Sequence, residues 1–112
     1  MSGITTHVLD TSLGRPAAGV SVLLESVGDV KGALLTFEAH TDADGRMREK
    51  LPWSVERGVY RLTFDTGAYF RERGVEAFYP EVTVTFEIRD PAQHHHVPLL
   101  ISPFGYSTYR GS

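Results

Sequence analysis

Apolar and polar residues alternate along much of the chain. The pattern is clearest in segment 82–88, where valine, phenylalanine and isoleucine share one face and threonine and glutamate occupy the other. Segment 59–65 repeats it, with Tyr60, Leu62 and Phe64 at every second position. A period of two is typical of a strand that buries one face and exposes the other. Both segments are therefore predicted to be half-buried strands.

Two more segments are predicted to pair as a hairpin. Segments 20–26 and 34–40 are rich in β-branched and aromatic residues, and Gly28, Asp29 and Gly32 between them predict a turn. Other short segments are bounded by Gly, Pro, Asp or Ser, which favours strands that end at these residues. These further strands are predicted at 5–11, 47–51, 94–101 and 106–109.

Only segment 66–74 has the character of a helix. Thr66 is suited to cap its first turn, good helix formers follow, and Gly74 is suited to end it. About eight short strands, spaced roughly 10 residues apart, and one short helix favour an all-β sandwich or barrel over a parallel α/β sheet.

Composition narrows the class of protein. A chain of 112 residues with 41% hydrophobic content is expected to fold as one domain, residues 1–112. Its net charge of −3 gives no basic stripe for a nucleic acid, and the absence of cysteine excludes disulfides and a cysteine nucleophile. No apolar stretch approaches ~20 residues and the start lacks a signal-peptide pattern, so we expect no membrane contact and a cytoplasmic location.

Three consecutive histidines stand in the predicted strand 94–101. Alternation places His94 and His96 on one face and His95 on the other. No nearby cysteine or carboxylate completes a recognisable ligand spacing, so a metal site is only weakly indicated. The competing interpretation is that these are partly exposed strand residues at a sheet edge.

His7 and Arg46 are the other candidates for chemistry. His7 shares a face with Thr5 in the first predicted strand, and Arg46 follows a turn-like segment. A positioned imidazole titrates near neutral pH and is suited to act as a general base toward water. The planar guanidinium suits an anionic or carbonyl-rich ligand, although an arginine after a hairpin turn is more often simply solvated. Residue types alone indicate a sandwich with a candidate polar site of His and Arg, and they do not indicate a particular reaction or ligand.

Several segments resemble the signature of the 5-hydroxyisourate hydrolase family, in the family's order and over nearly the whole chain. They are THVLD at 6–10, DGR at 44–46, HVPLL at 96–100, SPFG at 102–105 and YSTYRGS at 106–112. The closing Tyr-Arg-Gly-Ser is the most specific, since it distinguishes the hydrolases from transthyretin, a hormone carrier on the same fold. The resemblance implies an all-β, transthyretin-like two-sheet sandwich of about eight strands, with one short helix after the fifth.

The resemblance also implies a reaction. Water would attack the ring carbonyl of 5-hydroxyisourate and open the cyclic amide, giving 2-oxo-4-hydroxy-4-carboxy-5-ureidoimidazoline in urate breakdown, without metal, cofactor or covalent nucleophile. The two histidines would deprotonate the water and pass a proton to the leaving nitrogen, in roles that the resemblance does not divide between them. The catalytic residues would be His7, Arg46, His96 and Ser112, and His7, Arg46, Tyr109, Arg110 and Gly111 would bind the substrate.

The family assembles as a homotetramer, a dimer of dimers, with active sites in a channel between dimers, and the same is expected here. His95 departs from the family pattern, which often has Tyr at this position. Because alternation turns position 95 away from the face of His94 and His96, we expect no effect on catalysis. His94 and His40 fall outside the implied catalytic set.

Two other classes of protein compete with the hydrolase. A transthyretin-like carrier would hold a small apolar ligand in the same channel and would need a mainly apolar lining, whereas His7, Arg46, His96 and Arg110 would make the channel polar. A scaffold sandwich would have no use for these residues or for the last four residues of the chain. Ser112 is disfavoured as a nucleophile because no Gly-x-Ser-x-Gly motif is present. The sequence therefore favours the enzyme.

Overall fold

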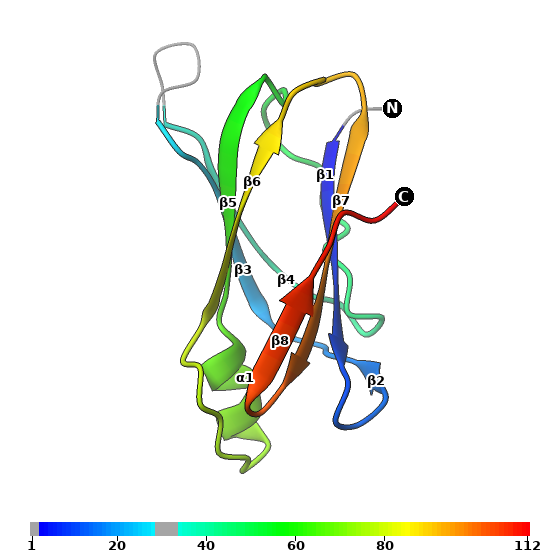
Figure 1. The fold of residues 1–112 in the computed structure, drawn as a ribbon, viewed down its shortest axis with the longest axis vertical. Coiled ribbons are helices and arrows are strands. Elements are labelled where there is room, and N and C mark those ends of the chain that lie inside the picture. Colours follow the sequence, from blue (N-terminus) through cyan, green and yellow to red (C-terminus); the bar gives the residue numbers. More distant parts are fainter. Residues whose placement is uncertain (1–2, 29–33) are drawn as a thin grey trace.

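The computed structural model describes residues 3–28 and 34–112, which form two four-stranded sheets facing each other (Figure 1). The first sheet has the order β2-β1-β7-β8, with bounds β1 Gly3–Asp10, β2 Arg15–Pro16, β7 His94–Ser102 and β8 Gly105–Thr108. The second has the order β4-β3-β5-β6, with bounds β3 Ser21–Ser26, β4 Thr36–His40, β5 Gly58–Phe64 and β6 Val82–Ile88. Neighbouring strands are antiparallel except β1 and β7, which run parallel. The predicted all-β sandwich is confirmed.

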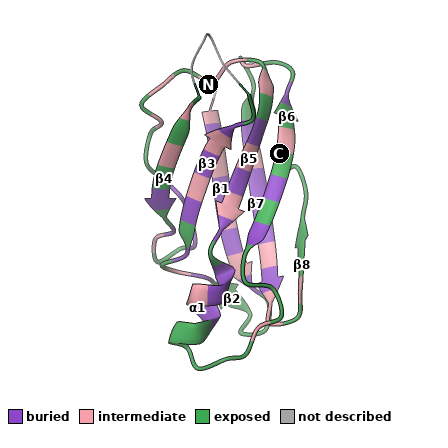
Figure 2. Cartoon of the chain, turned by 90° about the vertical axis from the view of Figure 1, so that its left-hand side faces the viewer, coloured by how far each residue is buried: buried purple, intermediate pink, exposed green. Residues whose placement is uncertain are grey.

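The predicted alternation holds in β5 and β6. Tyr60, Leu62 and Phe64 of β5 have no exposed surface, and Figure 2 shows buried residues alternating with more exposed ones along β5 and β6. In β6 the apolar positions are likewise buried, except that Phe86 is half-buried. Each large apolar side chain removed from water contributes about 1.5–3 kcal/mol to folding. The core therefore lies between the sheets, and the outer faces of the sheets are more accessible to solvent.

The predicted hairpin is present. Strands β3 and β4 pair from Ser21 opposite His40 to Glu25 opposite Thr36. Gly28 has a φ of +89°, which suits the turn that the sequence predicts there. The other two predicted turn residues, at positions 29 and 32, lie outside the described residues.

The helix α1 Thr66–Glu72 follows β5 at one end of the sandwich (Figure 1). Its cap is Asp65 rather than the predicted Thr66, because the Asp65 carboxylate accepts a 3.1 Å hydrogen bond from the N–H of Ala68. Thr66 is buried in the first turn instead. Gly74, with a φ of +69°, follows the helix as predicted. Within the described residues, no helix is long and apolar enough to cross a membrane.

The prediction of a strand at 47–51 is wrong. Arg46, just before it, forms a single bridge with His7, and regular pairing does not continue. The charged residues of the segment are exposed, and Pro52 has no N–H to donate to a ladder. The additional strand is instead the short β2, which pairs with the end of β1.

Candidate active site

The pairing of β1 with β7 joins two segments that lie far apart in the sequence. In their parallel register, Thr5 lies opposite His96 and His7 lies opposite Pro98. The even-numbered residues of β1 are buried in the core, whereas Thr5 and His7 are half-buried. Thr5, His7 and His96 therefore share the outer face of the first sheet, turned away from the second sheet.

A tight turn brings Arg46 to the same place. The Asp42 carboxylate accepts a 3.0 Å hydrogen bond from the backbone N–H of Arg46, and the N–H of Val8 donates a 2.7 Å bond to the carbonyl of Gly45. Gly45 has a φ of +76°, and a Cβ there would overlap the Val8 carbonyl oxygen. Only glycine permits this approach. The result is that Arg46 lies directly beside His7, with which it forms the bridge.

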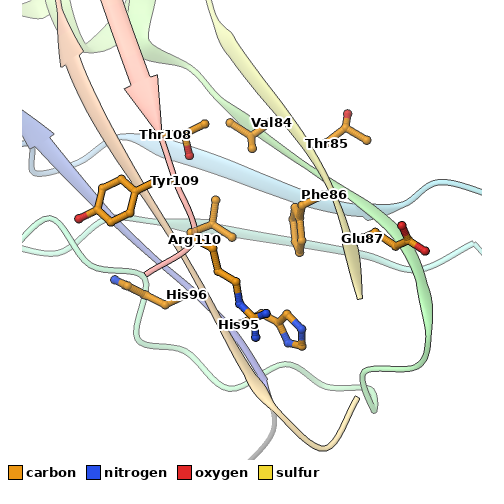
Figure 3. Close-up of a pocket in the computed structure, with 10 residues that line it drawn as sticks. Val84, Thr85, Phe86, Glu87, His95, His96, Thr108, Tyr109 and Arg110 are labelled. Carbon is orange, nitrogen blue, oxygen red and sulfur yellow. The ribbon is translucent and has the colours of Figure 1, made fainter. Parts of the chain in front are cut away.

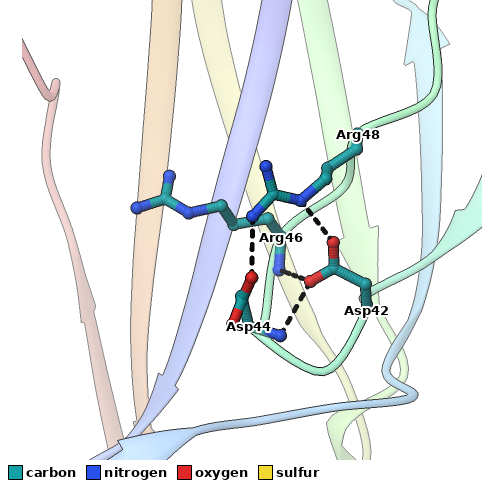
Figure 4. A network of polar contacts seen from close by, with 4 residues as sticks. All are labelled: Asp42, Asp44, Arg46 and Arg48. Atoms are coloured by element: carbon teal, nitrogen blue, oxygen red, sulfur yellow. Dashed lines mark hydrogen bonds and ion pairs between the residues drawn. The ribbon is translucent and has the colours of Figure 1, made fainter.

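The carboxylates of this turn are occupied by a different arginine. Arg48 donates a 2.6 Å hydrogen bond to Asp42 and a 2.8 Å bond to Asp44 (Figure 4). Hydrogen bonds from the Arg46 backbone and from Arg48 hold the pKa of Asp42 below its usual range. The Arg46 side chain points away from both carboxylates, and within the described residues its guanidinium makes no hydrogen bond or ion pair. Its charge and its donors are therefore left for a ligand.

The C-terminal tail packs against His96. The N–H of Gly111 donates a 2.8 Å hydrogen bond to the carbonyl of His96, and the two residues form an isolated β-bridge. A Cβ on Gly111 would lie 2.6 Å from Cδ2 of the His96 ring. The tail can therefore approach the imidazole this closely only without a side chain at position 111. Ser112, the next residue, is exposed.

A hydroxyl group bridges two histidines on this face. Oγ1 of Thr5 lies 2.8 Å from Nδ1 of His96 and 2.8 Å from Nε2 of His94. Burial lowers the pKa of His96 below its usual value, and electrostatic interactions with Arg46, His7 and His94 lower it further. The His96 imidazole is consequently neutral at neutral pH and able to accept a proton.

Arg110 and Tyr109 lie toward the neighbouring sheet edge. A cavity of about 250 Å³ opens between β6 and the tail, bordered by His95, His96, Tyr109 and Arg110 (Figure 3). Arg110 donates a 3.1 Å hydrogen bond to the side chain of Gln93. Burial lowers the pKa of His95, and the Arg110 charge adds to this effect. The Arg110 guanidinium thus lies near His95 and borders the same cavity as His96.

The structure therefore brings part of the predicted site together. It gathers His7, Arg46, His96 and Gly111, sets exposed Ser112 next to them, and leaves Tyr109 and Arg110 at the edge cavity. Sequence reasoning did not place Thr5 and His94 in the site. The signal was present, since alternation puts each of them on the same face as a predicted site histidine.

Chemically, this face offers imidazoles that accept or donate protons and the Arg46 guanidinium, which has no partner among the described residues and can bind an oxyanion. In the part of the chain that the structure describes, no three metal-ligating side chains gather into a group that could hold an ion. The arrangement fits acid–base chemistry on a carbonyl compound.

Comparison with known proteins assigns this chain to a family. A model described as the HIUase/Transthyretin family matches residues 4–111. The 5-hydroxyisourate hydrolase of Halalkalibacterium halodurans is 48% identical over an alignment of 119 positions, which covers 100% of this chain and 100% of that one. The structure of Klebsiella pneumoniae 5-hydroxyisourate hydrolase matches with a TM-score of 0.83 and 40% identity, covering 97% of this chain and 98% of that one. Sea bream transthyretin, solved in complex with thyroxine, matches with a TM-score of 0.86 and 29% identity, over 96% and 93% of the two chains. The chain belongs to the HIUase/Transthyretin family.

Proposed function

We propose that this protein hydrolyses 5-hydroxyisourate to 2-oxo-4-hydroxy-4-carboxy-5-ureidoimidazoline. One observation carries the proposal: His7, Arg46 and His96 meet on the outer face of one sheet, each held there by backbone pairing. Relatives that are 44% to 48% identical over almost the whole chain are named 5-hydroxyisourate hydrolase. Two histidines can transfer protons, and Arg46, which has no side-chain partner among the described residues, can stabilise an oxyanion, so this set of groups suits the opening of a cyclic amide by water.

In the proposed reaction, an imidazole removes a proton from water as the oxygen attacks the ring carbonyl. The new carbon–oxygen bond produces a tetrahedral oxyanion, and Arg46 offsets its negative charge. The carbon–nitrogen bond of the ring then breaks, and the proton is delivered to the leaving nitrogen. One water molecule is consumed, no electrons are exchanged, and a carboxylic acid remains on the product.

Tail residues complete the proposed site. Gly111 holds the tail against His96. In the proposed site, the hydroxyl of the adjacent Ser112 donates a hydrogen bond to the substrate. Tyr109 and Arg110 bind from the neighbouring edge, where they border the cavity. No metal, cofactor or covalent nucleophile takes part in the proposed mechanism.

We further propose that the chain works as a homotetramer, a dimer of dimers. The face that carries His7 and Arg46 is half-buried and open in one chain. Water weakens an electrostatic interaction with an oxyanion, so a second copy that covers this face would strengthen the stabilisation of the oxyanion by Arg46. A channel between two facing copies would supply that cover. Light scattering of the purified protein tests it, with a mass of four 12.4 kDa chains expected.

A transthyretin-like carrier remains the rival on the same fold, since sea bream transthyretin was solved with thyroxine. The outer face argues against an apolar ligand here, because imidazoles and a guanidinium occupy it. Freshly made 5-hydroxyisourate, generated by urate oxidase, separates the two functions. A hydrolase speeds the loss of its ultraviolet absorbance, and carbon NMR shows the new carboxylate; a carrier leaves the decay at the rate seen in buffer.

A further inference from the structure

The hydroxyl of Thr5 contacts two imidazole nitrogens but has a single hydrogen. It therefore donates to one of them and must accept from the other. Both contacts measure 2.8 Å, the length of a made hydrogen bond. Consequently one facing nitrogen, either Nδ1 of His96 or Nε2 of His94, carries a hydrogen and the other does not. The protonation states of the two rings are coupled through one side chain.

We propose that Thr5 and His94 form a proton relay that acts through His96, an inference that rests on the proposed hydrolase function. In the resting relay, Nδ1–H of His96 donates to Thr5, and the Thr5 hydroxyl donates to Nε2 of His94. Nε2 of His96 then has a free electron pair and accepts the proton of the attacking water. Thr5 and His94 are positioning residues, since neither touches the substrate.

The proton then moves in one concerted exchange. As His96 Nε2 takes a proton from water, the Nδ1 hydrogen of His96 passes to Thr5 and the Thr5 hydrogen passes to His94 Nε2. The result is a neutral His96 with its hydrogen on Nε2 and a cationic His94. When the carbon–nitrogen bond breaks, the His96 Nε2 hydrogen goes to the leaving nitrogen. The reverse exchange through Thr5 then restores the resting relay, so protons and charge balance over the cycle.

The surroundings of the two rings explain the direction of the exchange. His96 is half-buried, and this burial and the charge of Arg46 disfavour a cation on its ring, as its lowered pKa reflects. His94 is exposed at the start of β7. It also borders an open hollow of about 440 Å³ between β1 and segment 48–55. Water solvates a cation on His94 better than one on His96.

Thr5→Val tests the relay, because valine keeps the shape and removes the hydroxyl. We expect kcat to fall on the order of tenfold or more with little change in KM, since the relay serves proton transfer. Thr5→Ser restores the hydroxyl and is expected to recover most of the rate. Thr63→Val, a half-buried threonine in β5 of the other sheet, is the matched control and should keep the parent rate.

His94→Gln removes the proton acceptor at an exposed position and guards against a folding defect in the Thr5 variant. If the two residues act together, Thr5→Val with His94→Gln is no slower than the worse single variant. Nitrogen NMR of His96 should show hydrogen on Nδ1 in the parent and a mixture of tautomers in Thr5→Val. An active parent with unchanged kcat in folded Thr5→Val and His94→Gln would overturn the relay alone. An inactive parent would overturn the proposed function instead, and the tautomer measurement would still decide whether the hydrogen-bonded chain exists.

Discussion

Gly111 donates its backbone N–H to the carbonyl of His96 across 2.8 Å, and its missing side chain leaves room for the imidazole ring. The contact ties the tail of the chain to the strand that carries the proposed base. It also explains in physical terms why glycine stands at this position. An added methyl group at 2.6 Å from Cδ2 forces either the ring or the tail to move.

Gly111→Ala should therefore lower activity without unfolding the protein. The displaced ring loses its alignment with Thr5, and a misplacement of about 1 Å near the reacting atoms costs up to a hundredfold in rate. Measured kcat/KM and circular dichroism check this result. Gly105→Ala is a matched control in β8, since the nearest atom to an added Cβ there is a side-chain oxygen at 3.6 Å. Equal activity of the Gly111 variant and the parent would show that the tail does not position His96.

The His96 imidazole should stay neutral to lower pH than an ordinary histidine. Its pKa is lowered first by burial and then by the charge of Arg46, so the basic form is lost only as pH falls through that lowered pKa. The acid limb of kcat/KM should consequently lie below pH 6.5, the usual histidine value.

Arg46→Gln should raise the His96 pKa toward that usual value, because a nearby positive charge is removed. Proton NMR titration of the ring measures this shift without requiring activity. Arg48→Gln serves as the control, since its guanidinium is already paired with Asp42 and Asp44. A His96 pKa that does not change in Arg46→Gln would mean that the two side chains do not sense each other.

Tyr69→Phe should destabilise the fold while sparing the site. The Tyr69 hydroxyl donates a 2.8 Å hydrogen bond to the buried carboxylate of Asp10, at the end of β1. Burial and this bond raise the pKa of Tyr69 to about 12. Loss of a hydrogen bond to a charged group costs about 1.5–3 kcal/mol. Urea unfolding at one fixed protein concentration measures the difference.

The same pair predicts how that cost varies with pH. Burial alone would raise the pKa of Asp10, but bonds from Ser12 and Tyr69 lower it below its usual value. A depressed carboxylate pKa contributes stability above the unfolded-state pKa and loses it as pH falls through the folded-state pKa. The destabilisation by Tyr69→Phe should therefore be largest near neutral pH and shrink in acid. A cost that does not depend on pH would assign the effect to packing alone.

Gly45→Ala should separate Arg46 from His7. Alanine is strained at a φ of +76°, and its Cβ would overlap the Val8 carbonyl oxygen, so the turn must move away from β1. We expect lower activity together with a stability loss of more than about 1 kcal/mol. Gly14→Ala controls for backbone strain, because Gly14 has a similar φ of +69° but no neighbouring atom near an added Cβ. Similar loss of activity in both variants would argue against a positioning role for the Gly45 turn.

The local pattern predicted β5 and β6 because each of these strands buries one face, and the alternation of apolar and polar residues follows from that burial. The failure at 47–51 has the opposite origin. Arg48 of this segment pairs with Asp42 and Asp44 of the preceding turn, so its position is set by the turn and not by a sheet. The helix cap was misassigned by one residue, because Asp65 and Thr66 both suit a cap and only the backbone geometry selects Asp65.

The site could be predicted only in part, for a different reason. Alternation showed that Thr5 shares a face with His7, and His94 with His96. It could not show that Thr5 lies opposite His96, because the register of two strands about 90 residues apart is a tertiary property. The position of Arg110 beside His95 was likewise invisible, since it depends on how the tail leaves β8.

The most direct test of the proposed function compares His96→Ala with His40→Ala in the decay of 5-hydroxyisourate. His40 is an exposed histidine on β4 of the other sheet, so its removal matches the chemical change away from the site. The proposed function predicts rapid decay with the parent and with His40→Ala, and decay near the buffer rate with folded His96→Ala. Decay at the buffer rate with all three proteins, or equal acceleration by both variants, would contradict it.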